Sequence, residues 1–316
     1  MTNHCNFRCR HCFIDFSPKR DLPLEVYQTL ARDVGRLFWL DIGGGEPFLR
    51  NDIVEIVRAF DADVVTIPTN GFFVERTIAA TREIRERIAG ELTVAISIDG
   101  LQSTHDRIRQ VGSWNTLWTA FEELRTIPNV RVKINTVLCK ENFCEILELM
   151  ELVYQRRPDF HSIILLRGNP IDPTYGLPSF EELHAIQEPL FEILTRYDYG
   201  QKSLTSRMLR NYHRYLWNLS LATLKQRTQV IPCLAGQAHA VVMGNGDVSS
   251  CEMLSPIGNL KEASWKTIWQ SHEMNRQRQS IKDKQCHCTH NCAMLDSILY
   301  RSSSYGPLLA GVELQT

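Results

Sequence analysis

The sequence predicts an α/β protein built on a parallel β-sheet that is either open or curled into a barrel. Between residues 24 and 167, short apolar runs rich in β-branched residues alternate with amphipathic helical patterns. Because a strand follows each helix, neighbouring strands are expected to run parallel. The 316 residues also leave ample chain for a sizeable core.

The helical and strand patterns follow one another in a regular order. Apolar residues recur at helical spacing over 24–37, and 38–42 then has the pattern of a strand that ends at Gly43. Further helices are predicted at 52–60, 76–88, 116–125 and 145–155, and further strands at 64–68, 93–98, 130–138 and 162–166. Beyond residue 233, a β-hairpin pairs 240–243 with 248–251 and precedes a helix near 264–271.

The composition excludes several classes of protein. The 35 Lys and Arg residues balance 36 Asp and Glu, so the net charge of −1 gives no global field for nucleic acid or an anionic membrane. No uncharged apolar run approaches the roughly 18 residues that span a bilayer. The first ten residues lack the apolar core of a signal peptide. We therefore expect a cytoplasmic protein with no nucleic-acid or membrane partner.

The ten cysteines are grouped rather than scattered along the chain. They are Cys5, Cys9 and Cys12 near the start, Cys139 and Cys144 in the middle, and Cys233, Cys251, Cys286, Cys288 and Cys292 in the last third. Because a cytosolic compartment keeps thiols reduced, this grouping favours metal or cluster ligation over disulfides. The middle pair also suits small buried side chains.

The first three cysteines are close enough for one loop to surround a metal centre. Three thiolates leave a four-coordinate centre one ligand short, and a zinc site would need His4 or His11 to close it. A [4Fe–4S] cluster with three protein ligands instead keeps one iron open for a substrate or cosubstrate. The spacing therefore predicts either a closed zinc site or an open cluster.

Cys5-x3-Cys9-x2-Cys12 resembles the signature of the radical S-adenosylmethionine (radical SAM) enzymes. In that family the open iron binds S-adenosylmethionine, and an electron from the cluster cleaves it to a 5′-deoxyadenosyl radical that abstracts a hydrogen atom from the substrate. The run Gly43-Gly44-Gly45-Glu46-Pro47 is similar to the family's GGEP motif. Its glycines would let backbone carbonyls approach the ligand ammonium, and Glu46 would supply a carboxylate.

The resemblance also assigns cosubstrate positions at the ends of later strands. These are Asn70, Ser97, Asp99 and Asn135, with His11 packed near the adenine and the backbone around Phe13 at its edge. Barrels of this kind place their chemistry at the carboxyl ends of the strands, so these residues are expected to converge on one mouth. Because only residues 1–4 precede Cys5, most of the family's first strand is expected to be missing.

Cys233, Gly246-x4-Cys251 and Cys286-x-Cys288-x3-Cys292 resemble the SPASM/twitch extension of radical SAM enzymes. Five cysteines are too few for two [4Fe–4S] clusters with four ligands each. We expect one auxiliary [4Fe–4S] cluster held by Cys233, Cys251 and two of the other three cysteines. The histidines that could substitute as ligands are His239, His287 and His290, and a zinc knuckle is the alternative.

The resemblance implies three parts of the chain. Residues 1–167 would form a partial (β/α)6 barrel of the TIM type, and residues 168–232 a helical connecting segment that could cap the substrate. Residues 233–316 would form the twitch domain, a β-hairpin plus a helix around the auxiliary cluster.

The function that the resemblance implies is a radical SAM oxidoreductase that carries out a two-electron oxidation. The substrate is expected to be a small molecule or carbohydrate, because no leader-binding domain precedes the barrel, and the electron donor a flavodoxin or ferredoxin. Peptide modification of the RiPP type is an alternative. Epimerisation is another, with Cys139 or Cys144 returning the hydrogen atom. A non-catalytic iron–sulfur or zinc scaffold is disfavoured, because a scaffold has no need of Gly43 to Pro47 to chelate an amine.

Overall fold

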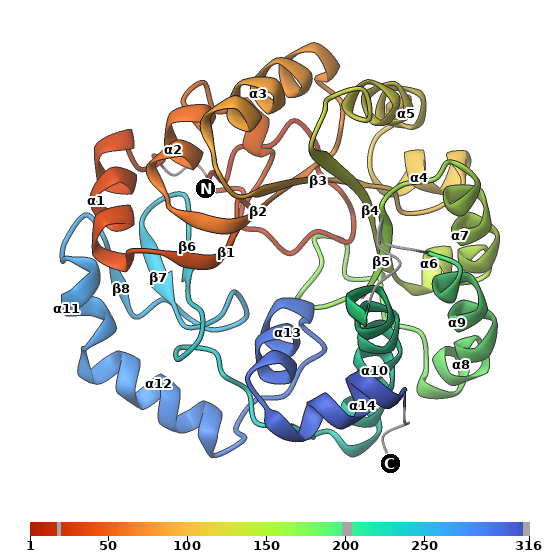
Figure 1. Ribbon diagram of the computed structural model, residues 1–316. Coiled ribbons are helices and arrows are strands. Elements are labelled where there is room, and N and C mark those ends of the chain that lie inside the picture. The colour runs from red at the N-terminus through yellow and green to blue at the C-terminus, as the bar shows by residue number, and fades with distance from the viewer. Residues whose placement is uncertain (18–19, 198–203, 312–316) are drawn as a thin grey trace.

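A computed structural model describes residues 1–17, 20–197 and 204–311. Five parallel strands form one curved sheet in the order β1-β2-β3-β4-β5 (Figure 1). They are β1 (Leu37–Asp41), β2 (Ala62–Thr69), β3 (Glu91–Ser97), β4 (Val130–Leu138) and β5 (Phe160–Leu165). This confirms the α/β class and the partial barrel, and all five predicted strands are present within a few residues of their expected bounds.

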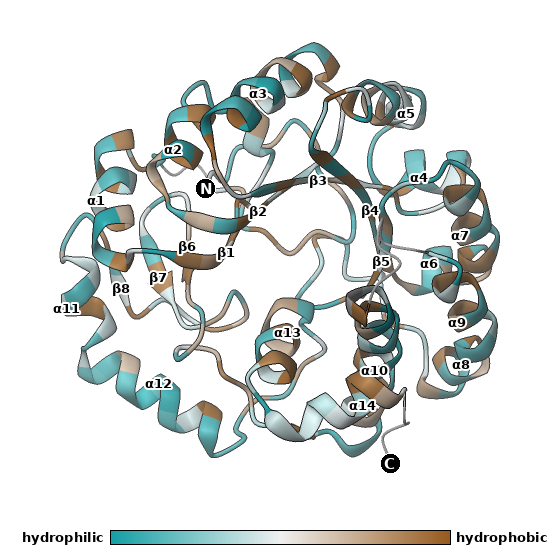
Figure 2. Cartoon of the chain, in the orientation of Figure 1, coloured by the Kyte–Doolittle hydropathy of each residue, from teal (hydrophilic) through white to brown (hydrophobic). Residues whose placement is uncertain are grey.

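Within residues 20–155, one helix precedes β1 and six connect the five strands, and all seven lie along the convex face of the sheet (Figure 1). They are α1 (Leu24–Val34), α2 (Ile53–Ala59), α3 (Val74–Arg87), α4 (Gln102–Ile108), α5 (Ser113–Leu124), α6 (Lys140–Phe143) and α7 (Ile146–Gln155), with a short 3-10 turn, η1 (Pro47–Leu49). Figure 2 shows apolar residues along the strands and the inner helix faces, and polar residues outside. The helix layer therefore buries one face of the sheet.

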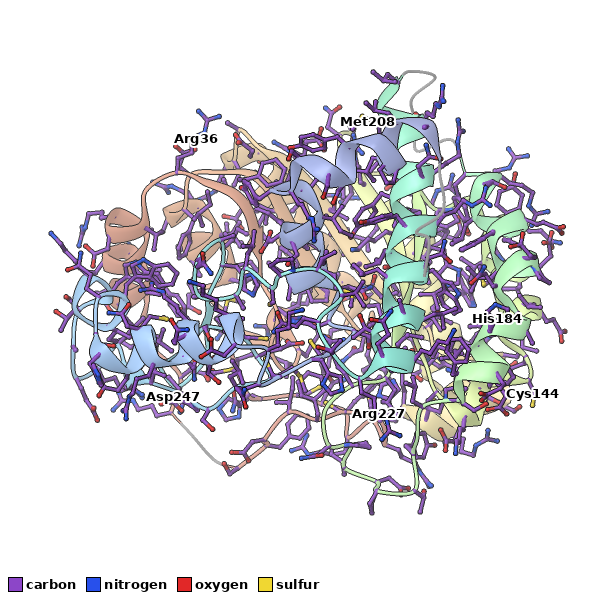
Figure 3. All side chains as sticks on the ribbon, turned by 90° about the horizontal axis from the view of Figure 1, so that it is seen from below. Arg36, Cys144, His184, Met208, Arg227 and Asp247 are labelled. Atoms are coloured by element: carbon purple, nitrogen blue, oxygen red, sulfur yellow. The ribbon has the colours of Figure 1, made fainter. Side chains whose placement is uncertain are left out.

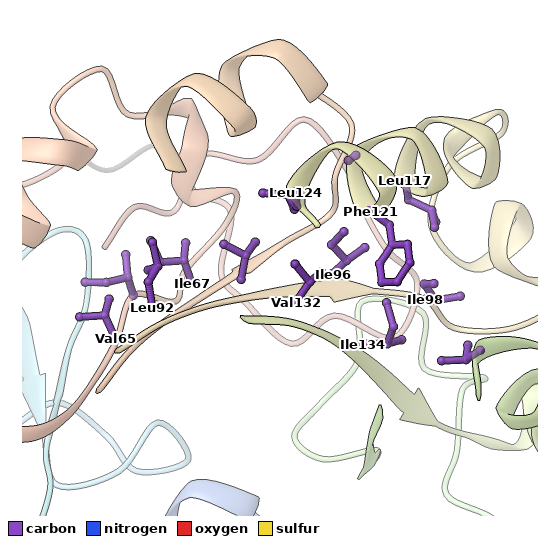
Figure 4. Packing of buried hydrophobic residues seen from close by; sticks show 14 of the residues in the cluster. Val65, Ile67, Leu92, Ile96, Ile98, Leu117, Phe121, Leu124, Val132 and Ile134 are labelled. Atoms are coloured by element: carbon purple, nitrogen blue, oxygen red, sulfur yellow. The ribbon is translucent and has the colours of Figure 1, made fainter. Parts of the chain in front are cut away.

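The core between sheet and helices fixes which side chains face the opposite, concave side. In β4, Val132 and Ile134 are buried, and Phe121 of α5 packs over this layer with Ile96 (Figure 4). Successive side chains of a strand point to opposite faces. The alternate residues of β4, among them Lys133 and Asn135, therefore face the concave side, which we call the lumen.

After β5, the chain first adds two helices to the outer layer beside α7 and then lies across the open side of the sheet (Figure 1). The helices after β5 are α8 (Phe180–Ala185), α9 (Gln187–Thr195), α10 (Leu204–Gln226), α11 (Trp265–Trp269), α12 (His272–Lys282), α13 (Asn291–Leu299) and α14 (Tyr305–Ala310), with a 3-10 turn η2 (Ser302–Ser304). The predicted hairpin is present as β6 (Val241–Val242) and β7 (Asp247–Ser249), and β8 (Gly258–Asn259) adds a third strand. No helix in the described part of the chain is long and apolar enough to cross a membrane.

Residues 1–4 occupy the place next to the end of β1 without forming a strand. The carbonyl of Thr2 accepts a hydrogen bond from the Gly45 N–H at 2.6 Å, and the carbonyl of His4 accepts one from the Glu46 N–H at 2.9 Å. These two bonds join residues 2–4 to the turn that follows β1. They bring Cys5 directly against this turn.

The packing in Figure 4 predicts a large cost for removing Phe121. Its ring is fully buried, so Phe121→Ala should destabilise the protein by about 3–5 kcal/mol, measured by urea-induced unfolding. Phe38 is 56% exposed on β1, and Phe38→Ala should cost less than about 1 kcal/mol. Equal losses in the two variants would contradict this assignment of the core.

Candidate metal centres

The loop that carries Cys5, Cys9 and Cys12 lies at the carboxyl end of the curved sheet. The Arg10 N–H donates to the Ile108 carbonyl at 2.9 Å, at the end of α4, and the Cys12 carbonyl accepts from the Ile171 N–H at 2.8 Å. These bonds hold the loop between α4 and the segment after β5. The three cysteines are therefore positioned by backbone contacts to distant parts of the barrel.

The three thiols are close enough to influence one another's ionisation. Burial raises the pKa of Cys5 and Cys12, and that of Cys9 to about 12, and a charged Cys12 raises the pKa of both Cys5 and Cys9 further. The Arg109 guanidinium opposes this effect, and its Nη1 lies 3.8 Å from the Cys9 sulfur. Three neighbouring thiolates carry more negative charge than one arginine balances, so the site fits a multiply charged metal centre.

Three cysteines on one loop can serve as ligands to separate irons of a cluster. Within residues 1–17, 20–197 and 204–311, no three His, Cys, Asp or Glu side chains are arranged to hold one ion. A cluster of four irons distributes its thiolates over separate irons, which matches three cysteines on one extended loop.

Asp99 connects this loop to the sheet. Its carboxylate is fully buried and accepts hydrogen bonds from Arg109 Nε at 2.5 Å and from the Val137 N–H at 2.8 Å. His11 Nε2 lies 2.6 Å from the same carboxylate. Burial alone would raise the pKa of the Asp99 carboxyl, but Arg109 and His11 hold it well below its usual range. Asp99 and His11, both expected at the cosubstrate, thus bind each other.

The glycines after β1 make room for the cysteine loop. A Cβ on Gly44, whose φ is +136°, would stand 2.4 Å from the Thr2 carbonyl oxygen, and one on Gly45 would stand 2.2 Å from that of His4. A Cβ on Gly43 would meet nothing within 4 Å. Gly44 and Gly45 are therefore needed for the close approach of residues 2–5, whereas the Gly43 carbonyl accepts a hydrogen bond from the Met1 ammonium at 2.8 Å.

Glu46 uses both of its carboxylate oxygens inside the protein. Its Oε1 accepts from Thr69 Oγ1 at 2.8 Å and from the Phe48 N–H, and its Oε2 accepts from the Asn70 N–H at 2.8 Å. Burial raises the pKa of this carboxyl to about 6, against the influence of those bonds. Glu46 therefore ties the turn after β1 to the end of β2, with buried Pro47 beginning η1 beside it.

Buried polar atoms without a partner mark a place for a ligand near the cysteine loop. Asn70 donates through Nδ2 to Asn6 Oδ1 at 2.8 Å, which leaves the Asn6 Nδ2 buried with no acceptor in the described structure. Asn135 Oδ1 is likewise buried without a donor. Asn6 was missed by the sequence analysis, although its place directly after Cys5 was a signal that could have found it.

The concave face carries a row of polar side chains. Ser97 of β3, Asn135 of β4 and Ser162 of β5 are register partners, so their side chains stand abreast in the lumen. Phe13 borders the same region, because a Cβ on Gly168 would touch its side chain at 2.9 Å. The structure thus gathers Ser97, Asn135, Asn70 and Phe13 around the cysteine loop, as expected, but nothing in it tests their contacts with a cosubstrate.

Deeper in the lumen, Asp41 of β1 and Lys133 of β4 face the thiol of Cys292 from α13. Burial raises the pKa of Asp41 to about 6 and lowers that of Lys133, while each of these charges favours ionisation of the other. Burial raises the pKa of Cys292 to about 12, and Asp41 raises it further. Lys133 was missed by the sequence analysis, although the alternation of apolar residues with Arg131, Lys133 and Asn135 along β4 was a signal that could have found it.

The second group of cysteines comes together on the other side of α13. Burial raises the pKa of Cys233 to about 11 and that of Cys251 to about 12, and a charged Cys288 raises both further. A charged Cys286 also raises the pKa of Cys233, and a charged Cys288 raises that of Cys286. Cys233, Cys286 and Cys288 line one cavity. Cys251, two residues after the end of β7, packs with Cys233 and Cys286. Three thiols that line one cavity, with Cys251 packed beside two of them, fit one auxiliary cluster.

The three histidines considered as ligands lie in different places. His239 Nδ1 pairs with Asp296 at 2.5 Å, and His287 is exposed at the rim of the cavity. His290 is buried, with Nδ1 at 3.6 Å from the Cys251 sulfur and Nε2 at 2.9 Å from Glu252. His290 is therefore the histidine in contact with a thiol.

A chain of charged contacts joins the two groups of cysteines. Arg167, directly after β5, donates through Nε to Glu252 at 2.7 Å, and Glu252 also pairs with His290 beside Cys251. The Arg167 guanidinium lies over the Phe13 ring, 5.3 Å from its centroid. Burial opposes ionisation of Glu252, but His290 and Arg167 lower its pKa to about 2. The contacts run from the first cysteine loop to the second group.

Cys139 and Cys144, the two cysteines in the middle of the sequence, differ in their burial. Cys139 is fully buried, in a cluster with Ile108, Leu166 and Tyr175, and burial raises its thiol pKa well above the usual range. Cys144 is exposed at the outer edge of the molecule (Figure 3). These positions favour a packing role for Cys139 and argue against Cys144 as a hydrogen-atom donor.

Family comparisons identify the class to which this arrangement belongs. The profile of the radical SAM superfamily matches residues 1–153, and that of the SPASM iron–sulfur cluster-binding domain matches residues 233–293. The chain belongs to the radical SAM superfamily and carries a SPASM/twitch extension. It accordingly uses a [4Fe–4S] cluster that binds S-adenosylmethionine and an auxiliary iron–sulfur cluster.

Particular relatives show the range of chemistry in this class. The AdoMet-dependent heme synthase of Methanosarcina barkeri is 26% identical over 312 residues, covering 91% of this chain and 85% of its own. The mycofactocin maturase MftC of Mycolicibacterium smegmatis is 26% identical over 298 residues, with 88% and 70% covered.

Two solved structures share the fold. One is anSMEcpe with bound AdoMet (TM-score 0.63, 16% identity, 89% of this chain and 81% of that one). The other is Streptococcus suis SuiB bound to precursor peptide SuiA (TM-score 0.65, 16% identity, 89% and 65%).

Gly43 and Gly45 offer a matched test of the turn after β1. Gly45→Ala should push His4 and Cys5 away and lose the first cluster, about four of about eight irons, whereas Gly43→Ala should keep all of them. Iron analysis of anaerobically reconstituted protein checks this. Full iron content in Gly45→Ala would show that the loop does not depend on this close approach.

The thiol contacts predict which cysteine is spare. Cys288→Ala should lose the auxiliary cluster, because Cys288 influences both Cys233 and Cys251. Cys292→Ala should retain it, because Cys292 is not among the residues that line the cavity shared by Cys233, Cys286 and Cys288 and lies instead near Asp41 and Lys133. Iron content and electron paramagnetic resonance (EPR) of the reduced proteins measure both. Loss of the cluster in Cys292→Ala alone would reverse the assignment.

Proposed function

We propose that this protein is a radical SAM oxidoreductase that abstracts a hydrogen atom from a substrate held in the lumen and completes a two-electron oxidation. The observation that supports this most is that the two groups of cysteines are joined through Arg167, Glu252 and His290, with the lumen beside them. An electron leaving the substrate would have the auxiliary cluster as its acceptor. We place the protein in the cytoplasm, where its free thiols would stay reduced.

The chain's own residues hold the groups that this chemistry needs. Cys5, Cys9 and Cys12 would hold the first cluster, which when bound supplies the electron that cleaves S-adenosylmethionine to a 5′-deoxyadenosyl radical. Arg109 partly neutralises the thiolates and is itself fixed by Asp99. The row of Ser97, Asn135 and Ser162 offers polar groups to the cosubstrate at the mouth.

The residues deeper in the lumen indicate which kind of substrate would bind there. Lys133 and Asp41 carry opposite charges there, and no ion pair within 4 Å joins them in the described structure. A substrate with a carboxylate and a hydrogen-bond donor complements both. This suits a small polar molecule, and it suits a peptide equally, which relatives such as SuiB bind. Peptide modification therefore stays the second candidate.

Cleavage of the cosubstrate tests the proposal. Protein reconstituted anaerobically with dithionite and S-adenosylmethionine should contain about eight irons and release 5′-deoxyadenosine. The triple variant Cys5→Ala, Cys9→Ala and Cys12→Ala should keep about half of the iron and release none. Zinc in both sites of anaerobically purified protein would refute the proposal.

The fate of the substrate separates oxidation from epimerisation. In deuterated water, oxidation should give a product two mass units lighter than the substrate, with no deuterium at carbon. A product of unchanged skeleton that gains one deuterium would identify an epimerase. If a Cys292→Ala or Cys139→Ala variant then lost that deuterium while still releasing 5′-deoxyadenosine, the substituted cysteine would be the hydrogen donor.

A further inference from the structure

We propose that Gln229 is a positioning residue of the auxiliary cluster: its side-chain amide aligns the segments that carry Cys233 and Cys286 and donates toward the Cys286 sulfur. The inference concerns the iron–sulfur site alone and does not depend on the substrate or on the outcome of the radical reaction. It rests on the assignment of Cys286 as a ligand.

The Gln229 amide joins three separate segments. It lies between the end of α10 and Cys233, and 8% of the residue is exposed. Its Oε1 accepts from the Cys233 N–H at 3.2 Å. Its Nε2 donates to the carbonyls of Ile281, in α12, and Cys286, each at 2.9 Å. One side chain thereby fixes the distance between two cysteine-bearing segments more than 50 residues apart.

The same nitrogen reaches a ligand sulfur. Gln229 Nε2 lies 3.9 Å from the Cys286 Sγ, and Gln229 lines the cavity shared by Cys233, Cys286 and Cys288. Hydrogen bonds to the sulfurs are among the factors that set the potential of an iron–sulfur cluster. A donor at this sulfur stabilises the more negative, reduced state, so it should raise the reduction potential of the auxiliary cluster.

A purely structural amide would behave differently from a positioning residue. If Gln229 only joined backbone segments, the neutral replacement Gln229→Met would change stability and leave the potential of any assembled cluster unchanged, whereas the charge that Gln229→Glu adds would lower the potential in either case. Gln285 provides a matched control, because it directly precedes Cys286 but is exposed and donates to the Asp283 carbonyl.

Three variants test the proposal. Gln229→Met keeps the length of the side chain without its polar atoms, and Gln229→Glu keeps an acceptor for the Cys233 N–H but removes both donors and adds charge. We would measure iron content and the auxiliary-cluster potential by EPR-monitored redox titration of the reconstituted full chain. Gln229→Met should lose half or more of the auxiliary iron, Gln229→Glu should shift the potential to a more negative value, and Gln285→Met should match the unsubstituted protein.

Two results would overturn the proposal. One is full iron content in Gln229→Met with an unchanged potential. The other, which decides the matter if Gln229→Met fails to fold, is Gln229→Glu with both clusters assembled and an unchanged potential. An auxiliary site that stays empty in Gln229→Glu while the first cluster assembles would support the positioning role. A lack of 5′-deoxyadenosine in the unsubstituted protein would count against the proposed function and leave these measurements valid.

Discussion

The buried carboxylate of Asp99 is the interaction on which the first metal centre depends. A fully buried charge is costly unless it is paired and hydrogen-bonded, and here Arg109, His11 and the Val137 N–H together satisfy it. These partners come from α4, the cysteine loop and β4. Because the carboxylate needs all three, the loop, the helix and the sheet are held in one arrangement, with Arg109 facing the Cys9 sulfur.

A second carboxylate, that of Glu252, plays a similar part between the two groups of cysteines. Arg167 approaches it from the barrel and His290 from the C-terminal extension. Both are linked to a cysteine-bearing segment, Arg167 through the Phe13 ring and His290 through the Cys251 sulfur. This partly buried contact therefore joins the C-terminal extension to the barrel.

Much of the fold could be predicted because its signals are local. Each strand of the curved sheet is an apolar run between turn residues, and the hairpin around Gly246 follows from its turn sequence. The helices α12 to α14 were not predicted. The strongly polar α12 buries two of its residues, Met274 and Ile281, and so lacks the apolar stripe on which the sequence analysis relied.

The sequence by itself determined the chemistry: the spacing of Cys5, Cys9 and Cys12 and the later cysteines identified the class and its clusters. Tertiary structure decided which groups share a site. The roles of Gly44 and Gly45 depend on a chain segment about 40 residues away, and that of Gln229 on one more than 50 residues away. The spacing of cysteines along the chain can identify ligands that lie on one loop. Contacts between distant segments form only when burial and hydrogen bonding bring those segments together.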